Sequence, residues 1–343
     1  MPSMPAAPKK PVNLALQGGG AHGAFTWGVL DRLLDDRRLE IEAISGTSAG
    51  AMNAVVAADG IMKGGSKGAQ AALEAFWKAV SSAALATPYK RTLLDMISGN
   101  WNLDHSPGYL FTDFLSRVAS PYDLNPFNLN PLRDFLVEQV NFERVRCCNK
   151  LKLFIAATSV QTGKVRIFDR SQLTPDVVMA SACLPQMFQA VTIQGEDFWD
   201  GGFSGNPPLH PFAYHCTAPD VIIVQINPLG CRKTPKLARE ILNRVNEITF
   251  NANLLSELRA IEFVSRLLDE GNLDPKRYKK MLIHAIEAEN GFQNLNASSK
   301  LNAEWEFLVH LHDIGRKVAD AWLEANVDAI GEHSTLDLKS LIH

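Results

Sequence analysis

A serine flanked by glycines is the feature of this sequence with the clearest potential for chemistry. Ser48 lies at the centre of Gly46-Thr47-Ser48-Ala49-Gly50, a G-x-S-x-G pattern that follows an apolar run and precedes a stretch of small residues. This context predicts a tight turn from a strand into a helix, where flanking glycines let the backbone bend and leave the hydroxyl exposed. Ser48 is therefore a candidate nucleophile for attack on a carbonyl.

A second glycine-rich segment comes earlier, in the stretch VNLALQGGGAHGAF. Gly18, Gly20 and Gly23 fit G-x-G-x-x-G between a predicted strand and a predicted helix, which is the context of a dinucleotide site. The same unpaired N–H groups can instead stabilise the oxyanion that forms when a serine attacks a carbonyl. A dinucleotide site expects an acidic residue at the end of the second strand. Glu40 and Glu42 lie at the beginning of the second predicted strand. The G-x-S-x-G pattern, and not an acidic residue, follows its end.

A serine hydroxyl becomes a good nucleophile only when a base within hydrogen-bond reach accepts its proton. The chain offers nine histidines and one acidic residue in unusual surroundings, Asp200 in the segment FWDGGFSGNPPL. Gly201 and Gly202 would let the chain turn sharply and present the carboxylate. On local grounds alone an Asp-Gly hairpin turn is the favoured explanation of this segment. These residues alone leave the identity of the base open.

The segments GGGAHG, GTSAG and DGG, in this order, resemble the motifs of the patatin-like phospholipase family of lipid acyl hydrolases. The resemblance extends through ASACLPQMFQAVTIQGEDFWDGGFSGNPPL and covers about residues 11 to 228. It implies a three-layer α/β/α fold and a catalytic dyad, with Ser48 as nucleophile and Asp200 as general base. It also implies an oxyanion hole in the glycine loop. The oxyanion-hole residues would be Gly18, Gly19, Gly20 and Ala21, and the motif-supporting residues His22, Gly23, Gly46, Gly50, Gly201 and Gly202.

His22 departs from the family pattern, in which this position of the glycine loop is usually arginine or lysine. Histidine titrates near pH 6.5, so an imidazole here is expected to weaken any fixed positive charge beside the site and to make the site pH-dependent. The substitution is expected to affect headgroup preference more than the acyl chemistry. The resemblance thus predicts a serine esterase of phospholipase A or lysophospholipase type, acting on lipid esters.

Three other interpretations keep the motifs but change the function. An α/β-hydrolase would use a Ser-Asp-His triad in that chain order. His210, His215, His284, His310 and His312 all lie after Asp200 and are candidates for its base. A Rossmann-like nucleotide sensor would use Gly18, Gly20 and Gly23 to hold phosphate. A non-catalytic family member would act as a scaffold, although Ser48 and Asp200 are both intact. The segment around Asp200 favours the dyad over the triad.

Strand and helix alternate in the first part of the chain, as an α/β layered domain requires. We expect strands over 12–17 and 40–45 and helices over 22–35 and 48–58, which places the glycine loop and Ser48 at successive strand-to-helix turns. A glycine-containing turn then leads into a further small-residue helix. Later patterns predict a hairpin over 150–169, a helix over 175–185 and a buried strand over 220–229.

Two regions lie outside this alternation. Residues 87–131 contain five prolines among aromatic residues and are expected to form a cap-like insertion, with most of its aromatics packed and the remainder facing an acyl chain or a membrane. After residue 230 the pattern is mainly helical, with apolar residues at helical spacing. We expect a catalytic domain over 11–230 and a helical C-terminal region over 231–343 that packs on the same core.

Composition narrows the class of protein. The 343 residues are 46% hydrophobic with a formal net charge of −3 and a pI near 6.3, which argues against a general nucleic-acid binder. Five cysteines show no C-x-x-C spacing and are expected to be reduced. With no secretory signal and no membrane-spanning run, we expect a cytoplasmic protein that can touch membranes peripherally. No metal-ligand spacing stands out, so we expect chemistry without metal or cofactor.

Overall fold

A mixed sheet forms the centre of the molecule. The computed structural model describes residues 8–231, 234–288 and 291–342. Within these residues the sheet has eight strands in the order β5-β6-β3-β2-β1-β7-β8, with β4 paired to β3. The parallel strands are β1 (Lys10–Leu16), β2 (Leu39–Gly46), β3 (Lys152–Ser159), β7 (Asp220–Gln225) and β8 (Leu282–Glu287). Of the antiparallel strands, β4 (Val165–Asp169) and β6 (Glu196–Asp200) pair with β3, and β5 (Val191–Ile193) pairs with β6.

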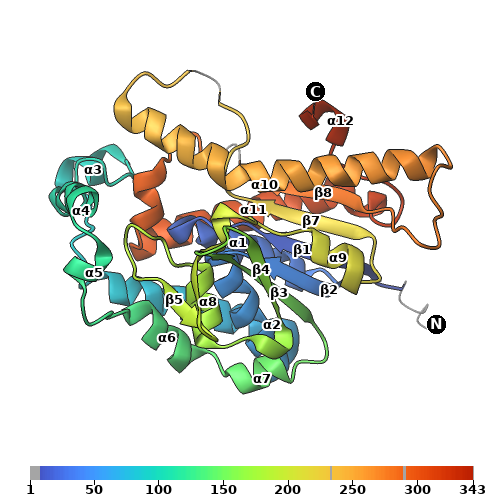
Figure 1. Ribbon diagram of the computed structural model, residues 1–343, viewed down its shortest axis with the longest axis horizontal. Coiled ribbons are helices and arrows are strands. Elements are labelled where there is room, and N and C mark those ends of the chain that lie inside the picture. Colours follow the sequence, from blue (N-terminus) through green and yellow to red (C-terminus); the bar gives the residue numbers. More distant parts are fainter. Residues whose placement is uncertain (1–7, 232–233, 289–290, 343) are drawn as a thin grey trace, which may run out of the picture.

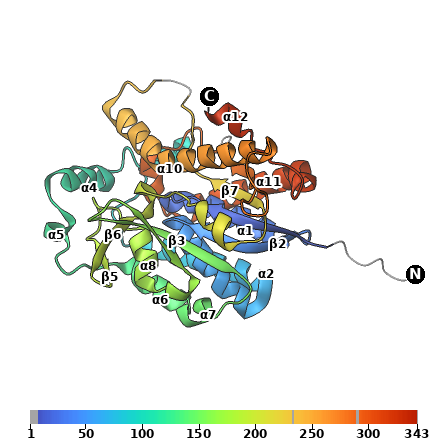
Figure 2. The same cartoon turned by 45° about the vertical axis from the view of Figure 1, so that its right-hand side comes forward.

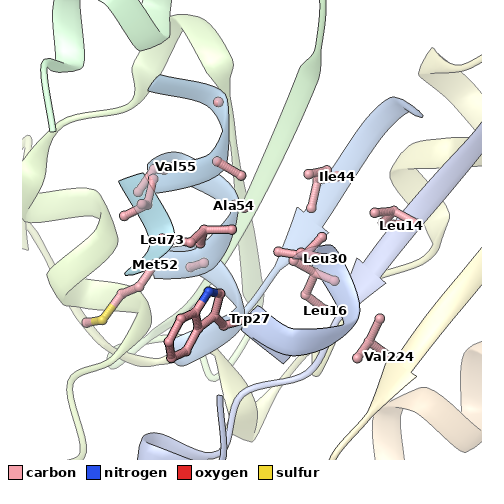
Figure 3. Packing of buried hydrophobic residues seen from close by; sticks show 14 of the residues in the cluster. Leu14, Leu16, Trp27, Leu30, Ile44, Met52, Ala54, Val55, Leu73 and Val224 are labelled. Atoms are coloured by element: carbon pink, nitrogen blue, oxygen red, sulfur yellow. The ribbon is translucent and has the colours of Figure 1, made fainter. Parts of the chain in front are cut away.

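Helices cover both faces of this sheet, so the expected three-layer α/β/α fold is confirmed (Figure 1). One face packs against α1 (Gly23–Asp35), α2 (Ala49–Ala84), α8 (Pro175–Ser181) and α11 (Trp305–Asn326). The other packs against α9 (His210–His215), α10 (Ala238–Asp269) and α12 (Leu338–Ile342). Side chains of β1 alternate between the two layers, because Leu14 and Leu16 enter the first core and Ala15 enters the second. Figure 3 shows the first core, where Leu14 and Leu16 lie near Leu30 of α1.

The first two strand-to-helix units lie close to their predicted positions. β1 leads through a short 3-10 turn, η1 (Gly20–His22), into α1, and β2 leads directly into α2. The long α2 breaks at Gly64 and Gly65, whose backbone angles are not helical. Beyond this break the helix returns along its own first half, where a side chain at Gly60 would overlap the backbone of Ala69. The glycine-containing turn predicted here is thus the break inside α2.

The insertion consists of three short helices. These are α3 (Leu93–Ser98), α4 (Pro107–Val118) and α5 (Pro121–Leu124), after which α6 (Pro131–Gln139) and α7 (Phe142–Arg146) lead the chain back to the sheet. Figures 1 and 2 place α3, α4 and α5 together at one end of the molecule. Trp101 packs on Phe307 as expected, but Phe111, Phe114 and Phe127 are 63%, 61% and 84% exposed. The expected packing of these aromatics therefore holds only in part.

The C-terminal region joins the same sheet. β8 pairs in parallel with β7, and α11 packs so closely on α1 that a side chain at Gly28 would overlap the backbone of His312. In α10 the apolar stripe divides. Leu254 and Leu258 are buried, whereas Leu237, just before α10, and the apolar residues of its first half are about half exposed or more: Ile241, Leu242, Val245 and Ile248. The first half of α10 thus leaves these apolar side chains exposed.

Candidate active site

Ser48 lies between the end of β2 and the start of α2. Its backbone has φ 54° and ψ −122°, a conformation that side-chain-bearing residues rarely adopt and that is typical of a nucleophile held on a sharp turn. Gly50 permits this turn, because a side chain there would strike the carbonyl oxygen of Leu16 on β1. The Ser48 N–H donates to Ser181 Oγ of α8 at 2.9 Å, which holds the turn in place.

The glycine loop lies directly against Ser48. A Cβ atom at Gly18 would lie 2.7 Å from Ser48 Cβ, so a residue with a side chain could not approach the serine this closely. The Gly18 N–H donates to Asn206 Oδ1 at 2.7 Å and is therefore already used. Among the described residues, the Gly19 N–H has no acceptor within the protein. Gly19, rather than Gly18, is thus the first candidate donor to an oxyanion.

Asp200 ends β6 and is 1% exposed. Its Oδ1 accepts a hydrogen bond from the Gly202 N–H at 2.7 Å. Burial raises the pKa of Asp200 to about 7, although this hydrogen bond, the nearby Ser48 hydroxyl and the charge of Lys300 oppose the rise. A carboxylate with such a pKa beside a serine hydroxyl can act as a general base near neutral pH.

Buried amides hold the glycine loop, and no motif had singled them out. Gln17 Oε1 accepts from the N–H groups of Ile226 and Asn227 at 2.8 and 2.9 Å, and Gln17 Nε2 donates to Asn251 Oδ1 of α10 at 3.0 Å. Asn227 Nδ2 donates to the Gly18 carbonyl oxygen at 2.9 Å. One feature of the sequence could have indicated Gln17 and Asn227: each is an amide residue that comes shortly after a buried apolar strand.

Lys300 is a second residue that the sequence patterns missed. It belongs to η4 (Ala297–Leu301), and its Nζ donates to Asn227 Oδ1 at 2.7 Å. The segment NASSKLN around it contains no recognisable motif. Only the fold brings this lysine from the C-terminal region to the glycine loop.

His22 does not behave as the sequence suggested. Its side chain is buried, bonds to Ser299 Oγ at 2.8 Å through Nε2 and packs edge-on against Phe292. Burial lowers the pKa of His22 well below 6.5, and the charge of Lys300 lowers it further. The imidazole is therefore neutral at physiological pH. This contradicts the expected titration of the site near pH 6.5 through His22.

The histidines considered for a triad have other partners. His210 bonds Glu257, His215 stacks on Phe154, His284 bonds Asp220 and Thr335, His310 stacks on Trp101, and His312 bonds Asp31. In the part of the chain that the structure describes, no hydrogen bond joins any of them to Ser48 or Asp200. The geometry therefore offers no support for a Ser-Asp-His triad.

Glu40 and Glu42 bear on the nucleotide interpretation. Both belong to the first half of β2, whereas the glycine loop and Ser48 follow the carboxyl ends of β1 and β2. Glu42 is also occupied, because it accepts hydrogen bonds from Thr217 and Lys152. Neither carboxylate is placed to hold a ribose beside the loop.

Comparisons with known proteins agree with the motifs. A family model described as patatin-like phospholipase matches residues 14–213. A comparison with curated proteins finds no match. Among solved structures, the chain is similar to VipD from Legionella pneumophila, with a TM-score of 0.39 and 15% identity over 92% of this chain and 67% of that one. The family match includes the glycine loop, Ser48 and Asp200 but ends before α10 and Lys300.

Proposed function

The chain belongs to the patatin-like phospholipase family, and we propose that it is a serine esterase that hydrolyses lipid esters through a Ser48–Asp200 dyad. The family match supports lipid acyl hydrolysis in general. The dyad is supported by one observation in particular, the position of the Ser48 hydroxyl beside a buried carboxylate whose pKa is about 7. The expected substrates are acyl esters of the kind cleaved by phospholipases A and lysophospholipases.

Acylation begins when Asp200 accepts the hydroxyl proton of Ser48 as Oγ attacks the ester carbonyl carbon. The new C–O bond converts the carbonyl into a tetrahedral oxyanion, which the N–H groups of Gly19, Gly20 and Ala21 are proposed to stabilise. The bond to the leaving alcohol then breaks, and the alcohol oxygen takes the proton from Asp200. The acyl group remains on Ser48 as an ester.

Deacylation repeats these transfers with water. Asp200 accepts a proton from a water molecule as the water oxygen attacks the acyl carbonyl, and the same N–H groups stabilise the second oxyanion. When this oxyanion collapses, the fatty acid leaves and the proton returns from Asp200 to Ser48 Oγ. One carboxylate thus serves both half-reactions, which suits its pKa of about 7 because it must accept and release a proton in turn.

Two variants of the full chain test the dyad. Ser48→Ala and Asp200→Asn should each lower kcat on a lipid ester by at least about 10³-fold, and the double variant should lose little more, because the pair acts as a unit. A fluorophosphonate probe should label the wild type at Ser48. His210→Gln is the matched control, since His210 follows Asp200 in the order a triad needs but bonds Glu257. Activity kept by Asp200→Asn and lost by His210→Gln would replace the dyad with a triad.

We also propose that the insertion contacts a lipid surface. None of the described helices is long and apolar enough to cross a membrane. The insertion nevertheless exposes many large apolar side chains, which we call the apolar cap: Leu93, Leu94, Ile97, Phe111, Phe114, Val118, Tyr122 and Phe127. Exposed apolar groups gathered in this way are typical of interaction sites, and aromatic side chains suit a membrane boundary.

The position of the apolar cap supports this contact. Figures 1 and 2 place α3, α4 and α5 at the same end of the molecule as the beginning of α10, whose first half also exposes apolar residues. Further along α10, the ring of Phe250 lies so close to Gly202 that a side chain at Gly202 would overlap it. α10 therefore leads from the exposed apolar end to the turn that carries Asp200, as delivery of a lipid to Ser48 would require.

A further inference from the structure

Lys300 reaches the candidate site from outside the segment that defines the family. The family match ends at residue 213, whereas η4 follows β8 near the end of the chain. Side-chain hydrogen bonds fix η4 to the stretch before α4: Ser298 Oγ accepts from the Leu103 N–H at 2.9 Å, and Asn302 Nδ2 donates to the Trp101 carbonyl oxygen at 2.9 Å. Lys300 is therefore held in a defined position rather than on a loose tail.

Backbone contact places this turn directly against the glycine loop. Gly20 has φ 58°, and a Cβ atom there would lie 2.5 Å from the carbonyl oxygen of Lys300. The side chain of Lys300 then extends the contact, because its Nζ donates to Asn227 Oδ1 and Asn227 Nδ2 donates to the Gly18 carbonyl oxygen. A continuous chain of hydrogen bonds thus joins the ammonium group to the loop beside Ser48.

Charged and titratable groups surround Lys300 and Asp200. The carboxylates of Glu247 on α10 and of Asp200 act electrostatically on the Lys300 ammonium, and this ammonium acts on the buried, neutral imidazole of His22. Burial lowers the pKa of Lys300 itself, and the two carboxylates oppose this change. Besides Lys300, Asp200 faces the thiol of Cys183, which stays protonated because burial and then Asp200 raise its pKa to about 12. Among these groups, Lys300 is the one whose positive charge lowers the pKa of Asp200.

We propose that Lys300 is a positioning residue for the Ser48–Asp200 pair: it anchors the glycine loop through Asn227 and brings a positive charge to the site. The inference deepens the proposed function and rests on it. It gives the C-terminal region a part in the site, since this region would complete a catalytic unit whose motifs all lie earlier in the chain.

The proposal has two separable consequences. A positive charge near a carboxylate lowers its pKa, so removing Lys300 raises the pKa of Asp200 above its present value of about 7. Because the ionised form is the base, the pH at which activity reaches half its maximum moves upward. Independently, loss of the bond to Asn227 loosens the loop and lowers the maximal rate reached at high pH. A residue that only fills space would not move the pH midpoint.

The test measures the rate of fluorophosphonate labelling of Ser48 against pH for the wild type and four variants. Lys300→Met and Lys300→Gln should move the midpoint upward by about half a pH unit or more and lower the plateau rate on the order of tenfold. Lys300→Arg keeps the charge and should keep the wild-type midpoint. Lys317→Met removes a charge from an exposed position on α11 and should match the wild type throughout.

Labelling reports on folded molecules, so the midpoint stays measurable even for a destabilised variant. A wild-type midpoint in both neutral variants would overturn the electrostatic role of Lys300, and an unchanged plateau would overturn the anchoring role. Failure of the proposed function looks different, because the wild type itself would then show neither labelling at Ser48 nor hydrolysis of a lipid ester. A midpoint shift of equal size in Lys317→Met would assign the effect to net charge and would also overturn the proposal.

Discussion

Ser48 and Asp200 meet beside β3, where the serine hydroxyl lies close enough to the carboxylate to lower its pKa. β2, which leads to Ser48, pairs with residues 152–155 of β3, and β6, which ends at Asp200, pairs with residues 157–159 on the same edge, because β4 occupies the other edge. The two residues therefore meet because parallel and antiparallel strands both end at this part of the sheet. The same arrangement buries the carboxylate, and burial is the largest cause of its raised pKa.

The raised pKa predicts the acid limb of the pH profile. Asp200 must be ionised to accept the serine proton, so kcat/KM on an uncharged ester should rise with pH through a midpoint near 7. His22 adds no second transition near pH 6.5, because its imidazole stays neutral there. Initial rates across the range from about pH 5 to 9 check this. A midpoint near the ordinary aspartate value of about 4 would contradict the role of burial.

Burial of Asp200 also predicts a link between activity and stability. In the unfolded chain this carboxyl loses its proton near pH 4, whereas in the folded protein it keeps the proton until about pH 7. The folded state binds the extra proton between these values, so the free energy of unfolding falls as the pH rises through this window. Asp200→Asn removes this pH-dependent fall in the free energy of unfolding. The variant should therefore melt a few degrees above the wild type at about pH 8, with a smaller difference at about pH 5.

Asp313→Asn serves as the control for that comparison, because Asp313 is an exposed carboxylate on α11. Its effect on the melting temperature should be small at both pH values. If Asp200→Asn melted below the wild type at the higher pH, the interactions of Asp200 with Gly202 and Ser48 would outweigh the loss from burial, and the carboxylate would stabilise the fold.

Gly19→Ala tests the oxyanion hole. Gly19 has an extended φ of 174°, which any residue can adopt, and its new Cβ would lie 3.1 Å from Ile226 Cγ2, so a small shift accommodates it. We expect kcat to fall by about 10²-fold, because the shift displaces an N–H donor, while KM and the melting temperature change little. Gly230→Ala adds a methyl group in open space and should leave kcat unchanged. Normal kcat with weakened nucleotide binding would make the loop a phosphate site.

The parts of the site that depend on local geometry could be predicted from the sequence. Gly18 and Gly50 are needed because backbone approaches too closely for a side chain, and this requirement leaves glycines at fixed spacing. Such spacing marks both strand-to-helix turns, and the alternation of apolar residues located β1 and β2 to within a few residues. The order of these elements indicated an α/β layered domain, and the family resemblance implied its three layers.

Long-range contacts could not be predicted in this way. Lys300 meets Asn227 only because the chain returns to the sheet as β8 and then turns back as η4. A histidine normally titrates near neutral pH, so the sequence suggested this for His22. Its pKa is lowered by burial beside Phe292, and that burial depends on how distant segments pack. Phe111, likewise, has the same helical spacing as a core residue, and nothing in its neighbours indicates that α4 leaves it exposed.

The exposed aromatic residues of the apolar cap provide the last prediction. The triple variant Phe111→Ser, Phe114→Ser, Phe127→Ser should bind phosphatidylcholine vesicles about 10- to 100-fold more weakly in co-sedimentation, since each ring contributes apolar area to the contact. Hydrolysis of lipid in those vesicles should fall in parallel, while hydrolysis of a short soluble ester stays at the wild-type rate. Phe263→Ser, at a position of α10 that is 51% exposed, is the control and should bind vesicles normally. Equal loss on the soluble ester would mean instead that these rings shape the site itself.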